Sequence, residues 1–161
     1  MKQLLALLLA VFIAACAYRP ISEAAFLGHE NISFSCEIKA SDVENTVDLA
    51  ELFIDFLQNR MHKNVVSKEA SSLHIDLKLL SLDFETIYLN EFSFSAGYKV
   101  TAKLEFKSSE DSDASTVTSG SYSFSASSEG SISSLARTNA IKEAIKEAMD
   151  SYAAQLAIKG S

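Results

Sequence analysis

The chain has 161 residues, and its 21 aspartates and glutamates outnumber its 14 lysines and arginines, for a formal net charge of −7. This length predicts one folded domain, and the acidic balance disfavours nucleic acid and anionic lipid headgroups as main partners. Because the chain has only two cysteines, it is not a disulfide-rich scaffold, and its stability must come from an apolar core.

Residues 1–15 have the composition of a bacterial signal peptide. Lys2 supplies a positive charge, and an unbroken apolar run follows from Leu4 to Ala15. At a rise of about 1.5 Å per residue, this run is too short to cross roughly 30 Å of hydrocarbon as a helix. We therefore expect residues 1–15 to be a lipoprotein signal peptide that is removed, and not a membrane span.

The leader ends in Ile13-Ala14-Ala15-Cys16, the pattern at which such peptides are cut before the cysteine. The Cys16 thiolate is suited to forming a thioether with diacylglycerol, and an N-acyl chain completes the anchor. Each buried methylene contributes about 0.8 kcal/mol, so several chains hold a protein firmly on a membrane. Ala17 stands where an aspartate is typical of lipoproteins kept in the inner membrane. The sequence therefore predicts lipidation of Cys16 and an outer-membrane location. The alternative is an ordinary secretory leader with an unmodified cysteine.

Residues 16–30 contain the only proline and show no periodicity, which indicates a tether that leads into a domain over residues 31–161. The segment from Asn31 to Lys39 then alternates as a half-buried strand. Its apolar face carries Ile32, Phe34, Cys36 and Ile38. On this pattern we expect Cys36 to be a small buried hydrophobe.

A helix is expected next, capped by Ser41 or Asp42, with Glu44 placed as in a capping box. Its apolar stripe consists of Val43, Val47, Ala50, Ile54, Leu57 and Met61, with Phe53 beside them. A polar stretch from His62 to Ser72 follows.

The second strand has Leu73, Ile75, Leu77 and Leu79 on one face. Leu80, Leu82 and Phe84 then continue the alternation one residue out of step, which predicts a bulge near Leu79 and Leu80.

A long strand is indicated by even-numbered apolar residues from Phe92 to Phe106, with a twist or bulge at Gly97. After a polar loop, a strand from Thr116 to Ala126 completes a hairpin, with Tyr122, Phe124 and Ala126 facing inward. A final helix is expected from about Ser133 to Ile158. Its apolar face carries Ala140, Ile141, Ala144, Ile145, Ala148, Met149, Tyr152 and Leu156.

The order β-α-β-β-β-α predicts an α+β two-layer sandwich, in which a mostly antiparallel sheet of four strands has both helices on one face. The other face, rich in serine, threonine, lysine and glutamate, is expected to meet water or a partner.

The sequence offers little for catalysis. His29, His62 and His74 fall at no metal-ligand spacing, so we expect no metal site. There is no nucleophile elbow and no phosphate-binding loop, and no His-Asp pair is visibly aimed at a serine. We therefore expect a protein that is not an enzyme and has no cofactor beyond its lipid.

Several segments together resemble the LptE family of lipopolysaccharide-assembly lipoproteins of Gram-negative bacteria. They are Tyr18-Arg19-Pro20 after the lipidation motif, Leu73 to Leu77, Tyr98 to Phe106, Gly120 to Ser125, and the closing helix rich in alanine and isoleucine. The resemblance covers nearly all of the chain after the leader, through patterns of strand and helix.

The resemblance implies a partner, the outer-membrane β-barrel LptD, with the domain on the periplasmic side or inside the barrel lumen. It also implies contact with lipopolysaccharide, for which the nearest basic residues are Lys99, Lys103 and Lys78. A mixed-charge solvated face explains the same lysines.

Two other functions remain open from the sequence. One is an auxiliary lipoprotein of another envelope transport or secretion complex. The other is a small lipid-binding or ligand-binding lipoprotein that uses the space between helices and sheet.

Overall fold

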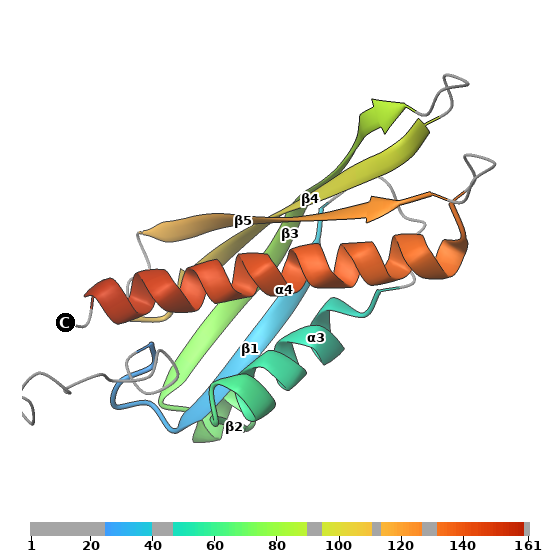
Figure 1. The fold of residues 1–161 in the computed structure, drawn as a ribbon. Helices are drawn as coiled ribbons and strands as arrows, with labels where there is room; N and C mark the ends of the chain where they lie inside the picture. Colours follow the sequence, from blue (N-terminus) through green and yellow to red (C-terminus); the bar gives the residue numbers. More distant parts are fainter. Residues whose placement is uncertain (1–24, 40–46, 90–94, 111–113, 127–131, 160–161) are drawn as a thin grey trace, which may run out of the picture.

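In the described residues, a mixed five-stranded sheet forms one layer and two helices form the other (Figure 1). The structure is a computed structural model that describes residues 25–39, 47–89, 95–110, 114–126 and 132–159. The strands are β1 (Asn31–Ile38), β2 (Asn64–Val65), β3 (Leu73–Leu89), β4 (Ser95–Ser108) and β5 (Ser115–Ser125). The helices are α3 (Leu49–Asp55), which continues into the π-helical turn η1 (Phe56–Arg60), and α4 (Ser134–Lys159). A 3-10 turn, η2 (Lys68–Ala70), precedes β3.

The sheet has one strand more than the predicted four, in the order β2-β1-β3-β4-β5. The strand that the sequence did not reveal is β2, whose two residues are too few to show a period of two. It pairs parallel to β1, and β1 also runs parallel to β3. The antiparallel character is confined to β3-β4-β5, where the predicted hairpin is confirmed.

Both helices cover the same face of the sheet, as predicted. Phe106 of β4 packs against Phe53 of α3, with ring centroids 6.1 Å apart, and stacks on Tyr152 of α4 at 3.9 Å. Because one inward side chain touches both helices, the two helices share a layer over this face.

The bulge expected near Leu80 is confirmed. The pairing of β3 with β4 shifts register between Leu79 and Ser81, and the buried face passes from odd-numbered to even-numbered residues there. A second irregularity lies around Tyr88, which pairs with Gly97. The ring of Tyr88 occupies the space that a Cβ on residue 97 would need, so any larger residue there would displace this ring.

The folded domain begins earlier than the predicted boundary at residue 31. Phe26 is only 2% exposed, packs edge-on against Tyr152 at 6.2 Å, and accepts a hydrogen bond from Lys63 Nζ through its carbonyl oxygen. Ala25 is buried beside it. These two residues belong to the core and not to the tether.

In the described residues, helix α3 begins at Leu49 and buries most of the predicted stripe, because Val47, Phe53, Leu57 and Met61 are all in the core. Asp48 caps it, accepting hydrogen bonds from the backbone N–H groups of Ala50 and Glu51, while Ser41 and Asp42 lie outside the described residues. The predicted stripe is wrong at Ile54, which is exposed. The buried face consists of Leu49, Leu52, Phe53, Phe56, Leu57 and Met61.

Cys36 departs from its expected burial. It pairs with the inward residue Leu77, so its predicted face is correct, but its side chain is exposed. Burial along β1 falls away after Phe34, which contacts Phe53 of α3. The alternation of a strand reports which face a residue occupies, and it does not report where the covering helix ends. Tyr122 on the edge strand β5 is exposed for a similar reason.

Helix α4 matches its prediction closely. Seven of the eight predicted inward residues are buried, and Ser133 caps the helix by accepting from the backbone N–H of Ala136. The helix lies very near β5, where Thr118 Oγ1 donates to the carbonyl of Ala148 at 2.8 Å. A Cβ on Gly120 would collide with the backbone at Ala144 and Ala148.

Candidate functional site

The face of the sheet opposite the helices is polar across β1, β3, β4 and β5. Its residues alternate with the buried ones and pair with one another across the ladders. They include Ser33, Ser35, Glu37, His74, Asp76, Lys78, Ser81, Asp83, Glu85, Lys99, Thr101, Lys103, Glu105, Lys107, Ser119, Ser121 and Ser123. We call this surface the polar sheet face.

All three lysines singled out from the sequence lie on the polar sheet face, in a row interleaved with carboxylates. Lys78 Nζ is 3.2 Å from Glu37 Oε2, and this hydrogen bond and its charge raise the pKa of Lys78. Lys99 is paired across the ladder with Glu85.

Lys103 stands between Ser81 and Ser119, four residues along β4 from Lys99. At about 3.3 Å per residue, these two lysines are roughly 13 Å apart along the strand. The three cations therefore do not converge on one point, and their arrangement is that of a mixed-charge surface.

The structure brings together a serine, a histidine and an aspartate that sequence reasoning did not connect. Ser33 Oγ lies 2.8 Å from His74 Nδ1, and His74 Nε2 lies 3.3 Å from Asp76 Oδ1. Ser33 and His74 are direct partners across the parallel β1–β3 ladder, a pairing that no local motif reveals.

The Ser33–His74–Asp76 cluster differs from a catalytic triad in one decisive respect, because its serine is buried. Ser33 is only 3% exposed, and its hydroxyl donates to Ser71 Oγ at 2.8 Å, so a substrate carbonyl has no path to it. Ser35 also donates to Asp76, and this bond, followed by the interactions with His74, lowers the pKa of Asp76. The cluster fastens β1 to β3 and to the residues after η2.

Described residues also line a groove and an open hollow away from the polar sheet face. A groove of about 320 Å³ between α3, η1 and α4 has Leu52 and Phe56 among its walls and is bridged by the Arg60–Asp150 ion pair at 2.7 Å. An open polar hollow of about 410 Å³ lies where the chain enters the domain, beside His29 and Lys63.

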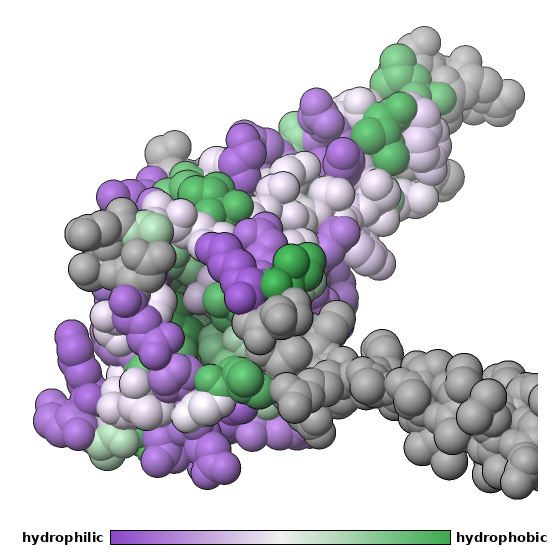
Figure 2. Space-filling model, turned by 90° about the vertical axis from the view of Figure 1, so that its left-hand side faces the viewer, coloured by the Kyte–Doolittle hydropathy of each residue, from purple (hydrophilic) through white to green (hydrophobic). Residues whose placement is uncertain are grey.

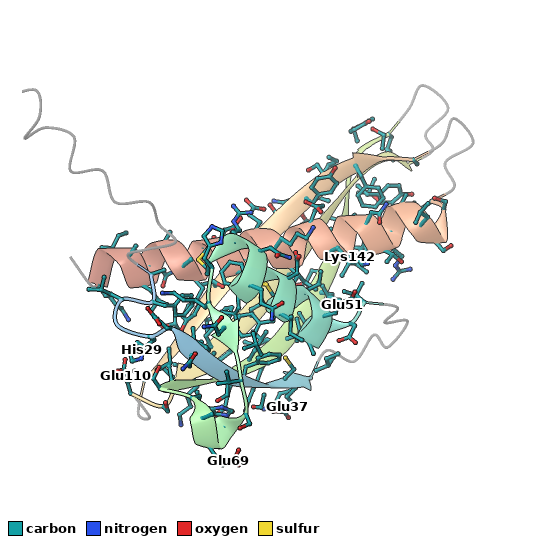
Figure 3. All side chains as sticks on the ribbon, turned by 90° about the horizontal axis from the view of Figure 1, so that it is seen from below. His29, Glu37, Glu51, Glu69, Glu110 and Lys142 are labelled. Carbon is teal, nitrogen blue, oxygen red and sulfur yellow. The ribbon has the colours of Figure 1, made fainter. Side chains whose placement is uncertain are left out.

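The end of the molecule where the chain enters is closed by a contact between distant loops (Figure 3). His29 Nε2 lies 3.0 Å from Glu110 Oε1, beyond β4, and His29 Nδ1 lies 3.3 Å from Ser72 Oγ. We call this end the base. Across the described ranges, no three His, Cys, Asp or Glu side chains gather as a metal site requires.

Cys16 lies outside the described residues. Within the part of the chain that the structure covers, neither helix combines the length and apolar character needed to cross a bilayer.

No protein-family model matches the chain, and no curated protein matches it in sequence. Among solved structures, the fold is similar to that of rare lipoprotein B from Shewanella oneidensis, with a TM-score of 0.51 and 16% identity over 80% of this chain and 95% of that one. A minor lipoprotein from Acinetobacter baumannii matches with a TM-score of 0.47 and 10% identity, over 81% and 92%. An uncharacterized lipoprotein B from Nitrosomonas europaea matches with a TM-score of 0.44 and 13% identity, over 89% of this chain and 90% of that one. At these identities, the first likeness shows a shared α+β fold.

Proposed function

We propose that this protein is a lipid-anchored outer-membrane lipoprotein that acts without catalysis, as the partner of an LptD-like β-barrel in lipopolysaccharide assembly. In this proposal Cys16 carries the diacylglycerol and the N-acyl chain. The domain then works by fitting against the barrel, from the periplasmic side or inside the lumen.

One observation carries the proposal: a chain that begins with a lipoprotein leader ending at Cys16 folds like a protein that is itself called rare lipoprotein B. The leader alone supports anchoring, and the fold alone supports no activity. Together they favour an envelope lipoprotein, and the LptE-like strand and helix pattern supplies the barrel as its partner.

The composition of the polar sheet face favours a protein partner whose own surface is polar. The lumen of an outer-membrane barrel is lined by polar side chains, and a flat surface of serine, threonine and paired charges is compatible with that environment. A carrier of apolar ligands is less well supported, because the space between helices and sheet is filled. Buried side chains there include Phe53, Phe106, Ile145, Met149 and Tyr152.

Direct binding of lipopolysaccharide phosphates by Lys99, Lys103 and Lys78 is a separate proposal with weaker support. Glu37, Glu85 and Glu105 neighbour these lysines and offset their charge. Phosphate recognition is strongest where several donors converge on one anion.

The test is to purify the lipidated protein with a C-terminal tag from a mild detergent extract of its own cells. We expect the LptD homologue to elute in near-equal amount, and depletion of the protein to reduce the assembled barrel and surface lipopolysaccharide. An inner-membrane ATPase complex in the eluate, with an intact envelope after depletion, would instead establish the transport-auxiliary alternative.

A further inference from the structure

A chain of hydrogen bonds runs in one direction across the parallel ladder between β1 and β3, which we call the seam. The Ser71 hydroxyl donates to the carbonyl oxygen of Lys68 at 2.8 Å, and the Ser33 hydroxyl donates to Ser71 Oγ at 2.8 Å. A serine hydroxyl has one hydrogen to donate. Ser33 Oγ lies 2.8 Å from His74 Nδ1 and can only accept there, so the ring nitrogen must carry the hydrogen.

The other ring nitrogen of His74 must donate as well. Its Nε2 lies 3.3 Å from Asp76 Oδ1. The hydrogen bond from Ser35 is the largest cause that lowers the pKa of the Asp76 carboxyl, so near neutral pH this group is ionised and only accepts. A neutral imidazole has one N–H group, whereas imidazolium has two. The bonding pattern around His74 therefore fits the imidazolium form.

Loss of the ring proton breaks this chain of hydrogen bonds. If the proton leaves Nδ1, Ser33 must turn its hydrogen from Ser71 to the ring, and Ser71 must turn its own hydrogen to Ser33. The carbonyl oxygen of Lys68 then keeps only the longer contact with the backbone N–H of Ser71, at 3.4 Å. If the proton leaves Nε2 instead, a bare nitrogen faces the Asp76 carboxylate. Ser33 is 3% exposed, so little water is available to replace the lost bond.

Charged groups reach the surroundings of His74 from each element that packs on the seam. They are Asp76 of β3, Glu37 of β1, Lys68 of η2, Lys107 of β4, and Glu110 beyond β4. Glu37 bonds to Lys78 and Glu110 bonds to His29. Lys68 has the weakest effect among the causes that lower the pKa of Asp76, and Lys107 is paired with Asp76 across the ladder. The charge in contact with the ring is the Asp76 carboxylate, and a negative neighbour favours imidazolium.

The ring also keeps some contact with water. The side chains of His74 and Asp76 are 14% and 44% exposed. Figure 2 shows hydrophilic residues over much of the surface at this end of the molecule. Because the ring is not fully desolvated, its charge is tolerated and its proton can exchange with solvent.

We propose that His74 is a pH-sensitive fastener of the seam, closed while the ring is imidazolium and loosened when the ring loses a proton. This proposal goes beyond the proposed function and does not depend on it. The folded network requires the charged ring, and the unfolded chain does not. The stabilisation that His74 provides is therefore present at low pH and is lost as the pH rises.

The test compares the thermal unfolding midpoints of four forms of the full lipidated protein at pH 5.5 and pH 8.5, on either side of the value of about 6.5 for a free imidazole. His74→Gln replaces the ring with a neutral side chain that does not titrate. Ser71→Ala keeps His74 but frees the Ser33 hydroxyl to donate to Nδ1, which removes the need for a charged ring. His62→Asn is the control, because His62 is exposed and asparagine tolerates its positive φ of 55°.

Between the two pH values, we expect the midpoints of the wild-type protein and His62→Asn to fall by about 3 °C more than those of His74→Gln and Ser71→Ala. Groups that titrate elsewhere are common to all four proteins, so their contributions cancel in the comparison. A fall of the same size in all four proteins overturns the inference.

A second measurement reads the ring of the wild-type protein directly, with a purification tag that contains no histidine. In nitrogen-15 spectra at pH 7, where a free imidazole is mostly neutral, we expect both ring nitrogens of His74 to carry hydrogen. The chain has three histidines, so His29→Gln and His62→Asn assign the His74 signals by elimination. A His74 ring with one bare nitrogen at this pH overturns the inference, even if His74→Gln or Ser71→Ala fails to fold.

Discussion

At the scale of single residues, the tightest constraint lies between β5 and α4. The backbone of α4 lies so close to Gly120 that a Cβ on this residue would collide with it. Two residues before Gly120, the Thr118 hydroxyl donates a hydrogen bond to the carbonyl oxygen of Ala148. Small residues on both elements, Ala144 and Ala148 on the helix, make this approach geometrically feasible.

Gly120→Val is therefore expected to destabilise the domain. The new side chain must push the helix backbone away from the sheet, and overpacking of this kind costs about 1–3 kcal/mol. Thermal unfolding of the purified protein measures the loss as a lower midpoint. Ser119→Ala, on the exposed neighbour, is the control, and an unchanged midpoint for Gly120→Val would mean that helix and strand lie further apart than described.

The Cys36 side chain is exposed to solvent, but its thiol is expected to react slowly. Desolvation by neighbouring protein atoms, and then the carboxylate of Asp48, raise the pKa of the Cys36 thiol from its ordinary value of 9.0 to about 11. A raised thiol pKa keeps the group protonated at neutral pH, and the thiolate is the form that reacts.

We expect iodoacetamide to alkylate Cys36 slowly at pH 7.5, because a pKa higher by two units leaves about a hundredfold less thiolate. In the Cys16→Ser protein, the alkylation rate should keep rising beyond pH 10. A free thiol such as glutathione, measured in parallel, should level off earlier. A Cys36 rate that levels off at pH 9 would contradict the raised pKa.

At the scale of elements, α3 depends on its first turn. It is short, it passes directly into η1, and its N-terminal amides at Ala50 and Glu51 bond to a single carboxylate, that of Asp48. Short helices gain little from propensity alone, so a cap matters more to them than to a long helix such as α4.

Asp48→Ala is expected to cost about 1 kcal/mol of stability, the usual effect of losing an N-cap acceptor. Asp48→Asn keeps an acceptor oxygen and should stay close to the wild-type protein in a urea titration. If the alanine and asparagine variants unfold together, the two hydrogen bonds contribute nothing to stability.

The elements that could be predicted from the sequence are those with long periodic signals. The face change at Leu80 and the extent of α4 could be predicted from such signals, because many residues in each element follow one hydrophobic periodicity. The two residues of β2 carry no such signal. Apolar residues occur on several sides of α3, so the sequence predicted the burial of Phe53, Leu57 and Met61 correctly but placed the exposed Ile54 among them. The Ser33–His74–Asp76 cluster was hidden because it depends on strand pairing.

At the scale of the whole molecule, the base and the end of β3 at Leu89 lie far apart. The chain enters at the base near Phe26, and β3 runs from there to Leu89. If Cys16 carries lipid as proposed, the base is the end nearest the anchor in sequence, and the end of β3 is the end furthest from it.

Cys16→Ser is expected to move the protein from the membrane fraction to the soluble periplasmic fraction without changing its unfolding temperature. Cys16 precedes the first described core residues, Ala25 and Phe26, by nine residues in the sequence, so only attachment should be lost. Fractionation and mass spectrometry of the N-terminal peptide measure the two parts of this expectation. Membrane association that survives the substitution would show that lipid is not the anchor.

The parallel pairing of β1 has a consequence for secretion. A chain exported from its N-terminus delivers β1 to the periplasm first, yet both neighbours of β1 arrive later, at β2 and β3. The antiparallel meander and α4 are joined by contacts closer in sequence and should assemble quickly, whereas β1 must wait with open edges. A chaperone that binds unpaired strand edges is therefore expected to act mainly on β1.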